Sequence, residues 1–151
     1  MHPTRIYTHH ESIVNDVQHH PKHNCLIGTV SDDLTLQILD SRSSSTEKSV
    51  SKSFRGHKDA INAVSFSPSC DTMIATGSAD NTIGIWDLRN LDTKLHALAG
   101  HGEAVTSLAW HPFEEGILGS ASYDRRICFW DLSRVGEEQT PDDVQDGPPE
   151  L

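Results

Sequence analysis

The segment GHKDAINAVSFSP (residues 56–68), followed by ATGSADNTIGIWD (75–87), decides the fold, because the chain contains three copies of its pattern. GHGEAVTSLAWHP (100–112) with GSASYDRRICFWD (119–131) is a second copy, and HESIVNDVQHHP (10–21) with TVSDDLTLQILD (29–40) is a third. The three copies align without a gap. In each, a histidine precedes a proline by 11 residues and an aspartate by 23, and the histidines are His10, His57 and His101. A repeat at periods of 47 and 44 residues indicates an array of similar structural units.

Each unit has the pattern of four short strands. Asn62–Phe66 and Thr106–Trp110 alternate with period two, as a strand covered on one side does. Second strands are expected at Met73–Ser78 and Ile117–Ser122, third strands at Ile83–Trp86 and Arg126–Trp130, and outer strands at Lys52–Phe54 and Lys94–Leu98. A Gly-His start and a Trp-Asp end are typical of the WD repeat, a four-stranded propeller blade. The sequence therefore predicts an all-β fold, an incomplete WD-repeat β-propeller of about three four-stranded blades.

The repeat boundaries divide the chain into five parts. They are an outer strand of a preceding blade (1–8), a first repeat with a serine-rich loop (9–53), a second repeat (54–98), a third repeat (99–135) and an acidic Pro/Gly loop (136–151). From Glu137 to Leu151 there are six acidic residues and no lysine or arginine. Such a segment is either a solvated tail or a binding loop for a basic partner.

Composition excludes several classes of function. Of 151 residues, 22 are acidic and 12 basic, so the net charge is -10, which disfavours direct binding of nucleic acid and favours a basic protein partner. No apolar run approaches the roughly 18–20 residues that cross a bilayer, so we expect no membrane insertion. Cys25, Cys70 and Cys128 are too few for a disulfide framework and suit the cytosol or nucleus.

The repeated histidines are better explained as structural than as catalytic or metal-binding. In WD-repeat proteins this histidine joins the turn aspartate, a strand Ser or Thr and the tryptophan in a buried hydrogen-bond network. The residues expected in the two complete networks are His57, Thr76, Asp80 and Trp86, and His101, Ser120, Asp124 and Trp130. The first copy has Leu39 in place of the tryptophan. Ser or Thr, His and Asp recur at the same positions of every repeat, which indicates a structural set of residues rather than one catalytic nucleophile with its base. We therefore expect no catalytic residue, no metal and no cofactor.

Nearly the whole chain outside the serine-rich loop resembles the WD-repeat retinoblastoma-binding histone chaperones, most closely their fungal branch that works with type B histone acetyltransferases. The resembling stretches are YTHHESIVNDVQHHP (7–21), GTVSDDLTLQILD (28–40), ATGSADNTIGIWDLRN (75–90), AVTSLAWHP (104–112), GSASYDRRICFWDLSRVGEEQTPDD (119–143) and DGPPEL (146–151). The acidic C-terminal part discriminates most, because generic blade packing gives it no role. Since the family propeller has seven blades, this chain corresponds to about repeats four to six, and we expect a truncated copy or a fragment.

The resemblance implies a non-catalytic histone-binding subunit of a type B acetyltransferase or chromatin-assembly complex, found in nucleus and cytoplasm. Its partners would be histone H4, possibly histone H3, and the acetyltransferase catalytic subunit. The residues matching the family's H4-binding loop are Asp142, Asp143, Asp146, Gly147, Pro148, Pro149, Glu150 and Leu151. The rim positions matching its H3-tail site are Asn15, Asn62, Glu103 and Thr106, although Ala60, Ala104 and Thr106 depart from the Glu or aromatic residues usual there.

Two other classes of function stay open. A generic WD-repeat scaffold, such as a ubiquitin-ligase substrate receptor, would keep the blades without the histone loop. A metal-dependent enzyme built on the ten histidines would hold zinc in stoichiometric amount.

Overall fold

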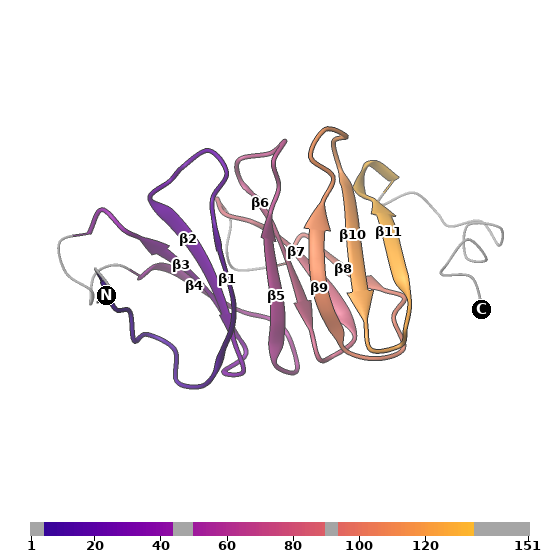
Figure 1. The fold of residues 1–151 in the computed structure, drawn as a ribbon, viewed down its shortest axis with the longest axis horizontal. Coiled ribbons are helices and arrows are strands. Elements are labelled where there is room, and N and C mark those ends of the chain that lie inside the picture. The colour runs from indigo at the N-terminus through magenta and orange to yellow at the C-terminus, as the bar shows by residue number, and fades with distance from the viewer. Residues whose placement is uncertain (1–4, 44–49, 90–93, 135–151) are drawn as a thin grey trace.

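The computed structural model describes residues 5–43, 50–89 and 94–134 and places their strands in three antiparallel sheets. The first sheet contains β1 (Val14–His19), β2 (Leu26–Ser31), β3 (Thr35–Asp40) and β4 (Val50–Arg55) in that order. The second contains β5 (Ile61–Phe66), β6 (Met73–Ser78), β7 (Thr82–Asp87) and β8 (His96–Ala99). The third contains β9 (Val105–Trp110), β10 (Ile117–Ser122) and β11 (Ile127–Asp131), and a 3-10 turn, Leu132–Arg134, follows. The sheets stand side by side in chain order (Figure 1).

This arrangement confirms the expected all-β class and open propeller-like form. One outer strand differs in position from the expectation. The sequence predicts it over Lys94–Leu98, whereas the structure has it over His96–Ala99. Its ladder with β7 runs from the Ile85–His96 pair to the Thr82–Ala99 pair, so the strand extends to the residue before Gly100.

Two apolar layers hold the three sheets together. Trp86, Ile74 and Val64 of the second sheet pack against the first sheet, where Phe54 meets Trp86 edge-on at 5.3 Å between ring centroids. Ile83 and Ile85 of the same sheet face the third sheet, in a second layer with Ala75, Val105, Trp110 and Leu118. The second sheet is therefore buried on both faces, which accounts for the continuous apolar run of β7 where a one-sided strand would alternate.

Close packing between the second and third sheets requires a glycine. Gly77 lies on β6, and a Cβ there would lie 2.6 Å from Cγ1 of Val105 on β9. Since such a contact forces a backbone or side-chain shift, the absence of a side chain at Gly77 sets how closely these two sheets approach.

Polar side chains of β1 hold the free edge of β5. The carboxylate of Asp16 accepts a hydrogen bond from the Val64 amide at 3.1 Å, and Oε1 of Gln18 accepts one from the Phe66 amide at 2.6 Å. The side-chain amide of Asn15 donates to the carbonyl of Ile61 at 2.9 Å. The first strand of one sheet thus satisfies backbone groups of the next sheet that have no strand partner.

The two ends of the stack remain open in the described structure. β1 and β9 alternate between covered and exposed residues, because each has a neighbouring sheet on one side only. Val14 and Val17 are more than half exposed at one end, and Ile127 and Phe129 are 67% and 79% exposed at the other. Each end of the stack therefore presents apolar residues that the described sheets do not cover.

The contact between Gln18 and β5 predicts a loss of stability on truncation. Gln18→Ala leaves the Phe66 amide without its acceptor, so the free energy of unfolding should fall by about 1–3 kcal/mol. Urea denaturation followed by tryptophan fluorescence measures the change. His19→Ala removes the exposed neighbouring side chain and is the matched control. Equal midpoints for the two variants would show that Gln18 contributes nothing to the sheet interface.

Candidate functional site

In the second sheet, a chain of four side chains crosses the blade from its interior to its turn. Nε1 of Trp86 donates to Oγ1 of Thr76 at 2.8 Å, and Thr76 lies 2.7 Å from Nε2 of His57. Nδ1 of His57 lies 3.0 Å from the carboxylate of Asp80. Thr76, His57 and Trp86 are all buried, so the chain connects β6, β7 and the segment before β5 out of contact with solvent.

The direction of these hydrogen bonds follows from what each group can donate. An indole N–H only donates, so Thr76 accepts from Trp86 and has its own hydroxyl proton left for Nε2 of His57. His57 must then carry its proton on Nδ1, where it donates to Asp80. These assignments describe a neutral histidine protonated at Nδ1, the proton position that the Asp80 carboxylate favours.

Charge and burial agree with this assignment. Burial is the largest influence on His57 and lowers its pKa below the ordinary value, although the neighbouring Asp80 opposes that effect. Burial raises the pKa of Asp80, but the hydrogen bonds from Thr82, Lys58 and His57 outweigh it and lower the pKa to about 2. Asp80 is thus an anion at neutral pH that accepts from the histidine, from the amides of Lys58 and Thr82, and from the Thr82 hydroxyl.

The third sheet repeats this geometry. His101 lies 2.9 Å from Asp124 through Nδ1 and 2.7 Å from Ser120 through Nε2, and Trp130 donates to Ser120 at 2.8 Å. Burial raises the pKa of Asp124, yet the Gly102 amide and His101 are among the groups that lower it to about 2. The residues expected to share a network lie together in both sheets.

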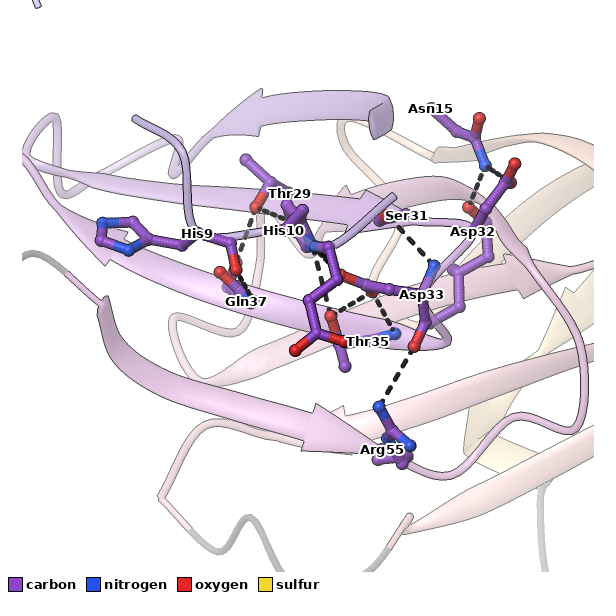
Figure 2. Close-up of polar contacts among 12 residues, drawn as sticks. His9, His10, Asn15, Thr29, Ser31, Asp32, Asp33, Thr35, Gln37 and Arg55 are labelled. Atoms are coloured by element: carbon purple, nitrogen blue, oxygen red, sulfur yellow. Dashed lines mark hydrogen bonds and ion pairs between the residues drawn. The ribbon is translucent and has the colours of Figure 1, made fainter. Parts of the chain in front are cut away.

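The first sheet keeps the histidine and aspartate but has no indole. Figure 2 shows His10 between Asp33 and Thr29, both at 2.8 Å. Burial raises the pKa of Asp33, but donors that include Thr35 and His10 lower it to about 2. Leu39 stands in the tryptophan position and Gln37 in the position of Gly84.

The long side chain of Gln37 occurs in the one sheet of the three that has Leu39 in place of the tryptophan. A Cβ at Gly84 would lie 2.8 Å from Nε1 of Trp86, and the third sheet, which has Trp130, carries only the small side chain of Cys128 at this position. With Leu39 instead, Nε2 of Gln37 donates to the carbonyl of His9 at 3.2 Å (Figure 2), whereas Oε1 of Gln37 is buried without a hydrogen-bond partner among the described residues. The first copy thus differs from the other two at both positions, with a larger side chain at one and a smaller one at the other.

The aspartate also stabilises a strained turn. Leu34, Asn81 and Arg125, which follow the three aspartates, have φ of 70°, 71° and 67°, a conformation that costs free energy for a residue with a side chain. In each turn the carboxylate accepts from the amide two residues onward at 2.9 Å, as Thr35, Thr82 and Arg126 show. These bonds hold the aspartate across the turn between the second and third strands of each sheet.

Sequence reasoning missed several residues of this framework. Ser31, Ser78 and Ser122 accept from the amide of the turn aspartate at 3.1–3.2 Å, and they share one repeat position that the alignment displays. Asp16 and Gln18 occur in one copy only, so no repeated signal marks them.

The repeated residues join the strands and the turn of their own sheet through hydrogen bonds. The Thr76 and Ser120 hydroxyls that contact these imidazoles are buried within their sheets, and each also accepts a hydrogen bond from an indole. Within residues 5–43, 50–89 and 94–134, no group of three or more His, Cys, Asp or Glu side chains is placed to hold a metal ion. Over the same ranges, no helix is long and apolar enough to cross a membrane.

The four rim residues differ in how free their side chains are. Asn15 donates to Asp32 and to the carbonyl of Ile61, as Figure 2 shows for Asp32, and Asn62 donates to the carbonyl of Val105 at 2.9 Å. The Thr106 hydroxyl donates to the carbonyl of Ala121. Glu103 is exposed beside the third sheet. Three of the four therefore make framework contacts.

The acidic residues expected to bind a histone lie outside the described residues. They are Asp142, Asp143, Asp146, Gly147, Pro148, Pro149, Glu150 and Leu151. Their assignment stays a prediction from the sequence.

The second network predicts a large effect from a small change. Asp80→Asn replaces a carboxylate that accepts four hydrogen bonds with an amide that has one acceptor oxygen, so buried donors lose partners. We expect unfolding to become easier by roughly 2–4 kcal/mol, measured by urea denaturation. Asp71→Asn makes the same chemical change in an exposed ion pair with Lys22 and should cost less than about 1 kcal/mol. If both variants shift the midpoint alike, the network contributes nothing specific.

The lowered pKa values also predict how stability depends on pH. His57, Asp33, Asp80 and Asp124 all bind protons more weakly when folded, so the unfolded state takes up more protons and stability falls as pH falls. His57 contributes below its ordinary pKa of 6.5. The aspartates contribute between their ordinary 3.8 and about 2. Urea midpoints measured across this range should decline in both windows, and a flat profile from about pH 4 to 2 would exclude the ionised aspartates.

Comparison with known proteins agrees with this geometry. The WD domain, G-beta repeat family matches residues 1–40, 48–87 and 92–131. The chain is 81% identical over 149 residues to a histone acetyltransferase type B subunit 2 of Aspergillus fumigatus. The aligned residues cover 99% of this chain and 34% of the relative. Proteins of the same name in Neurospora crassa and Schizosaccharomyces pombe are 76% and 62% identical over 98% and 99% of this chain, and 33% and 34% of their own lengths. The chain thus spans about a third of the length of these curated relatives, and it belongs to the WD-domain, G-beta-repeat family.

Proposed function

We propose that this chain is a non-catalytic, histone-binding part of a WD-repeat subunit of a type B histone acetyltransferase complex, acting in nucleus and cytoplasm. The observation that carries the proposal is the 81% identity, along 99% of the chain, to a protein named as subunit 2 of that enzyme. The proposed partners are histone H4, the catalytic subunit and, through the rim, histone H3.

The network geometry supports a binding role over an enzymatic one. Each His-Asp pair of the described sheets is occupied in holding its own blade together. The sheets then supply a rigid scaffold, on which exposed turns and loops are free to bind a partner.

Charge supports a basic partner. The segment from Glu137 to Leu151 carries six acidic and no basic side chains, whereas the rest of the chain is close to balanced. Histone helices are rich in arginine and lysine, and a carboxylate can accept two parallel hydrogen bonds from one guanidinium. By resemblance, Asp143 and Asp146 are the residues that would meet a histone arginine.

The rim supports a narrower proposal for histone H3. Since Asn15, Asn62 and Thr106 make framework hydrogen bonds, Glu103 is the rim residue with an exposed carboxylate for a lysine or arginine of the H3 tail. The H3 proposal therefore rests on Glu103.

A titration with matched charge variants tests the H4 proposal. Asp143→Asn with Asp146→Asn and Glu137→Gln with Glu138→Gln each remove two charges from the full chain. Fluorescence anisotropy with a labelled peptide of the first H4 helix should show binding by the parent chain and a loss on the order of a hundredfold in the aspartate variant. The glutamate variant should change affinity only a few-fold, because the resemblance assigns no histone contact to Glu137 or Glu138.

Two outcomes would contradict the proposal. Equal losses in the two variants would mean that the segment attracts the peptide only as a diffuse negative charge. No binding by the parent chain, with a folded circular dichroism spectrum, would favour a generic WD-repeat scaffold.

A further inference from the structure

A buried histidine joins the loops that follow β1 and β5. His20 stands directly after β1 and is 1% exposed. Its Nε2 lies 2.7 Å from the carbonyl of Asp71, in the loop between β5 and β6. Its Nδ1 lies 3.1 Å from the amides of both Lys22 and His23, in the loop between β1 and β2. One imidazole thus bridges a loop of the first sheet and a loop of the second.

The partners of this ring fix where its proton lies. Backbone amides only donate, so Nδ1 of His20 is the unprotonated acceptor, and the carbonyl of Asp71 only accepts, so the proton lies on Nε2. This is the opposite tautomer to that of His57, whose Nδ1 faces the carboxylate of Asp80. A second proton on His57 would meet an anion nearby, whereas a second proton on His20 would meet two N–H groups in a buried site.

The matching residue of the second sheet closes its loop without an ionisable group. Ser67 occupies the repeat position of His20, and its hydroxyl accepts from the Cys70 amide at 3.2 Å. The third sheet again has a histidine, His111, whose Nδ1 accepts from two amides as that of His20 does. The turn itself thus needs only an acceptor at this position. A loop closed by a histidine differs from one closed by a serine in that acid can remove the acceptor.

The other groups around His20 pack on the ring or pair with each other. Phe66 and His23 lie against the imidazole, at 4.9 and 4.7 Å between ring centroids. The titratable groups that face the ring are Lys22 and His23 from its own loop and Asp71 from the facing loop. Lys22 and Asp71 form an ion pair at 2.7 Å, so their opposite charges offset one another at the ring. Burial and the two amide donors therefore decide against a charged imidazole in this position.

We propose that His20 is a pH-sensitive latch between the first and second sheets. While the imidazole is neutral, it accepts from the loop of residues 20–25, donates to the loop of residues 67–72 and holds the two together. When a proton from solvent binds Nδ1, the ring loses the Lys22 and His23 amides, and the loop of the first sheet opens. Histidine changes its charge between about pH 5 and 8, so the latch opens in mildly acidic conditions. The latch lies between two sheets that are both described, and it does not depend on the proposed histone binding.

Hydrogen exchange followed by NMR tests the latch in the full chain. Measured exchange rates are divided by intrinsic rates, so that the direct effect of pH on exchange is removed. From about pH 7.5 to about pH 5.5, protection of the Lys22 and His23 amides should fall by about tenfold or more, because both lose their acceptor. The Cys70 amide, which Ser67 holds in the matching loop, should keep its protection and is the internal control. Unchanged protection at Lys22 and His23, or an equal fall at Cys70, would overturn the proposal.

A non-titrating variant separates His20 from the ionisable groups around it. In His20→Asn the side-chain oxygen can still accept from amides two and three residues onward, but it does not titrate. Protection of the Lys22 amide should then be independent of pH over the same range. His23→Asn removes the exposed neighbouring imidazole and should keep the pH dependence of the parent chain. A fall in protection that persists in His20→Asn would assign the effect to another group and contradict the latch.

The tautomer provides a test that needs no variant. Nitrogen chemical shifts of the imidazoles at about pH 7.5 should show His20 protonated at Nε2 and bare at Nδ1, the reverse of His57. A proton on Nδ1 of His20 at that pH would overturn the proposal, because the ring would then have no acceptor for the two amides.

Discussion

One ionised aspartate in each repeat accepts hydrogen bonds from parts of the chain that lie far apart in sequence. Asp80 holds His57, which precedes it by 23 residues, through the imidazole, and it also holds the Lys58 amide and the following turn. Through His57 and Thr76 it is connected to Trp86, whose ring packs against Phe54 of the neighbouring sheet. The polar network within a blade and the apolar layer between blades thus meet at one indole. Loss of the carboxylate would affect both.

Structure and proposed binding occupy different residues in this molecule. The sheets commit their repeated polar groups to one another and their apolar groups to neighbouring sheets, and Asp16, Gln18 and Asn15 extend this to the free edge of β5. The proposed histone binding would use the exposed carboxylate of Glu103 and the acidic C-terminal segment. Under that proposal, the residues that bind the partner are not the ones whose hydrogen bonds stabilise the sheets.

Much of the framework was predictable because it repeats. Three aligned copies indicated the sheets, the turns and the partners of His57 and His101, since a network built three times leaves the same residue types at the same spacing. Contacts made once leave no such signal. The bonds from Asp16 and Gln18 to the next sheet, and the bond from Gln37 to the carbonyl of His9, depend on how two particular surfaces meet. The histone site was assigned by resemblance and charge, and it lies outside the residues whose structure is described.

A double-mutant cycle between Asp80 and Trp86 tests most directly whether the four side chains act as one unit. Asp80→Asn and Trp86→Phe each remove one end of the chain of hydrogen bonds, and the two residues do not hydrogen-bond to each other but are joined through His57 and Thr76. The unfolding free energies of the single and double variants should show a coupling of about 1 kcal/mol or more, whereas the pair Asp124→Asn with Trp86→Phe, in separate sheets, should be additive within about 0.5 kcal/mol. Additivity in the first cycle would contradict the account, because the aspartate and the indole would then stabilise the blade independently.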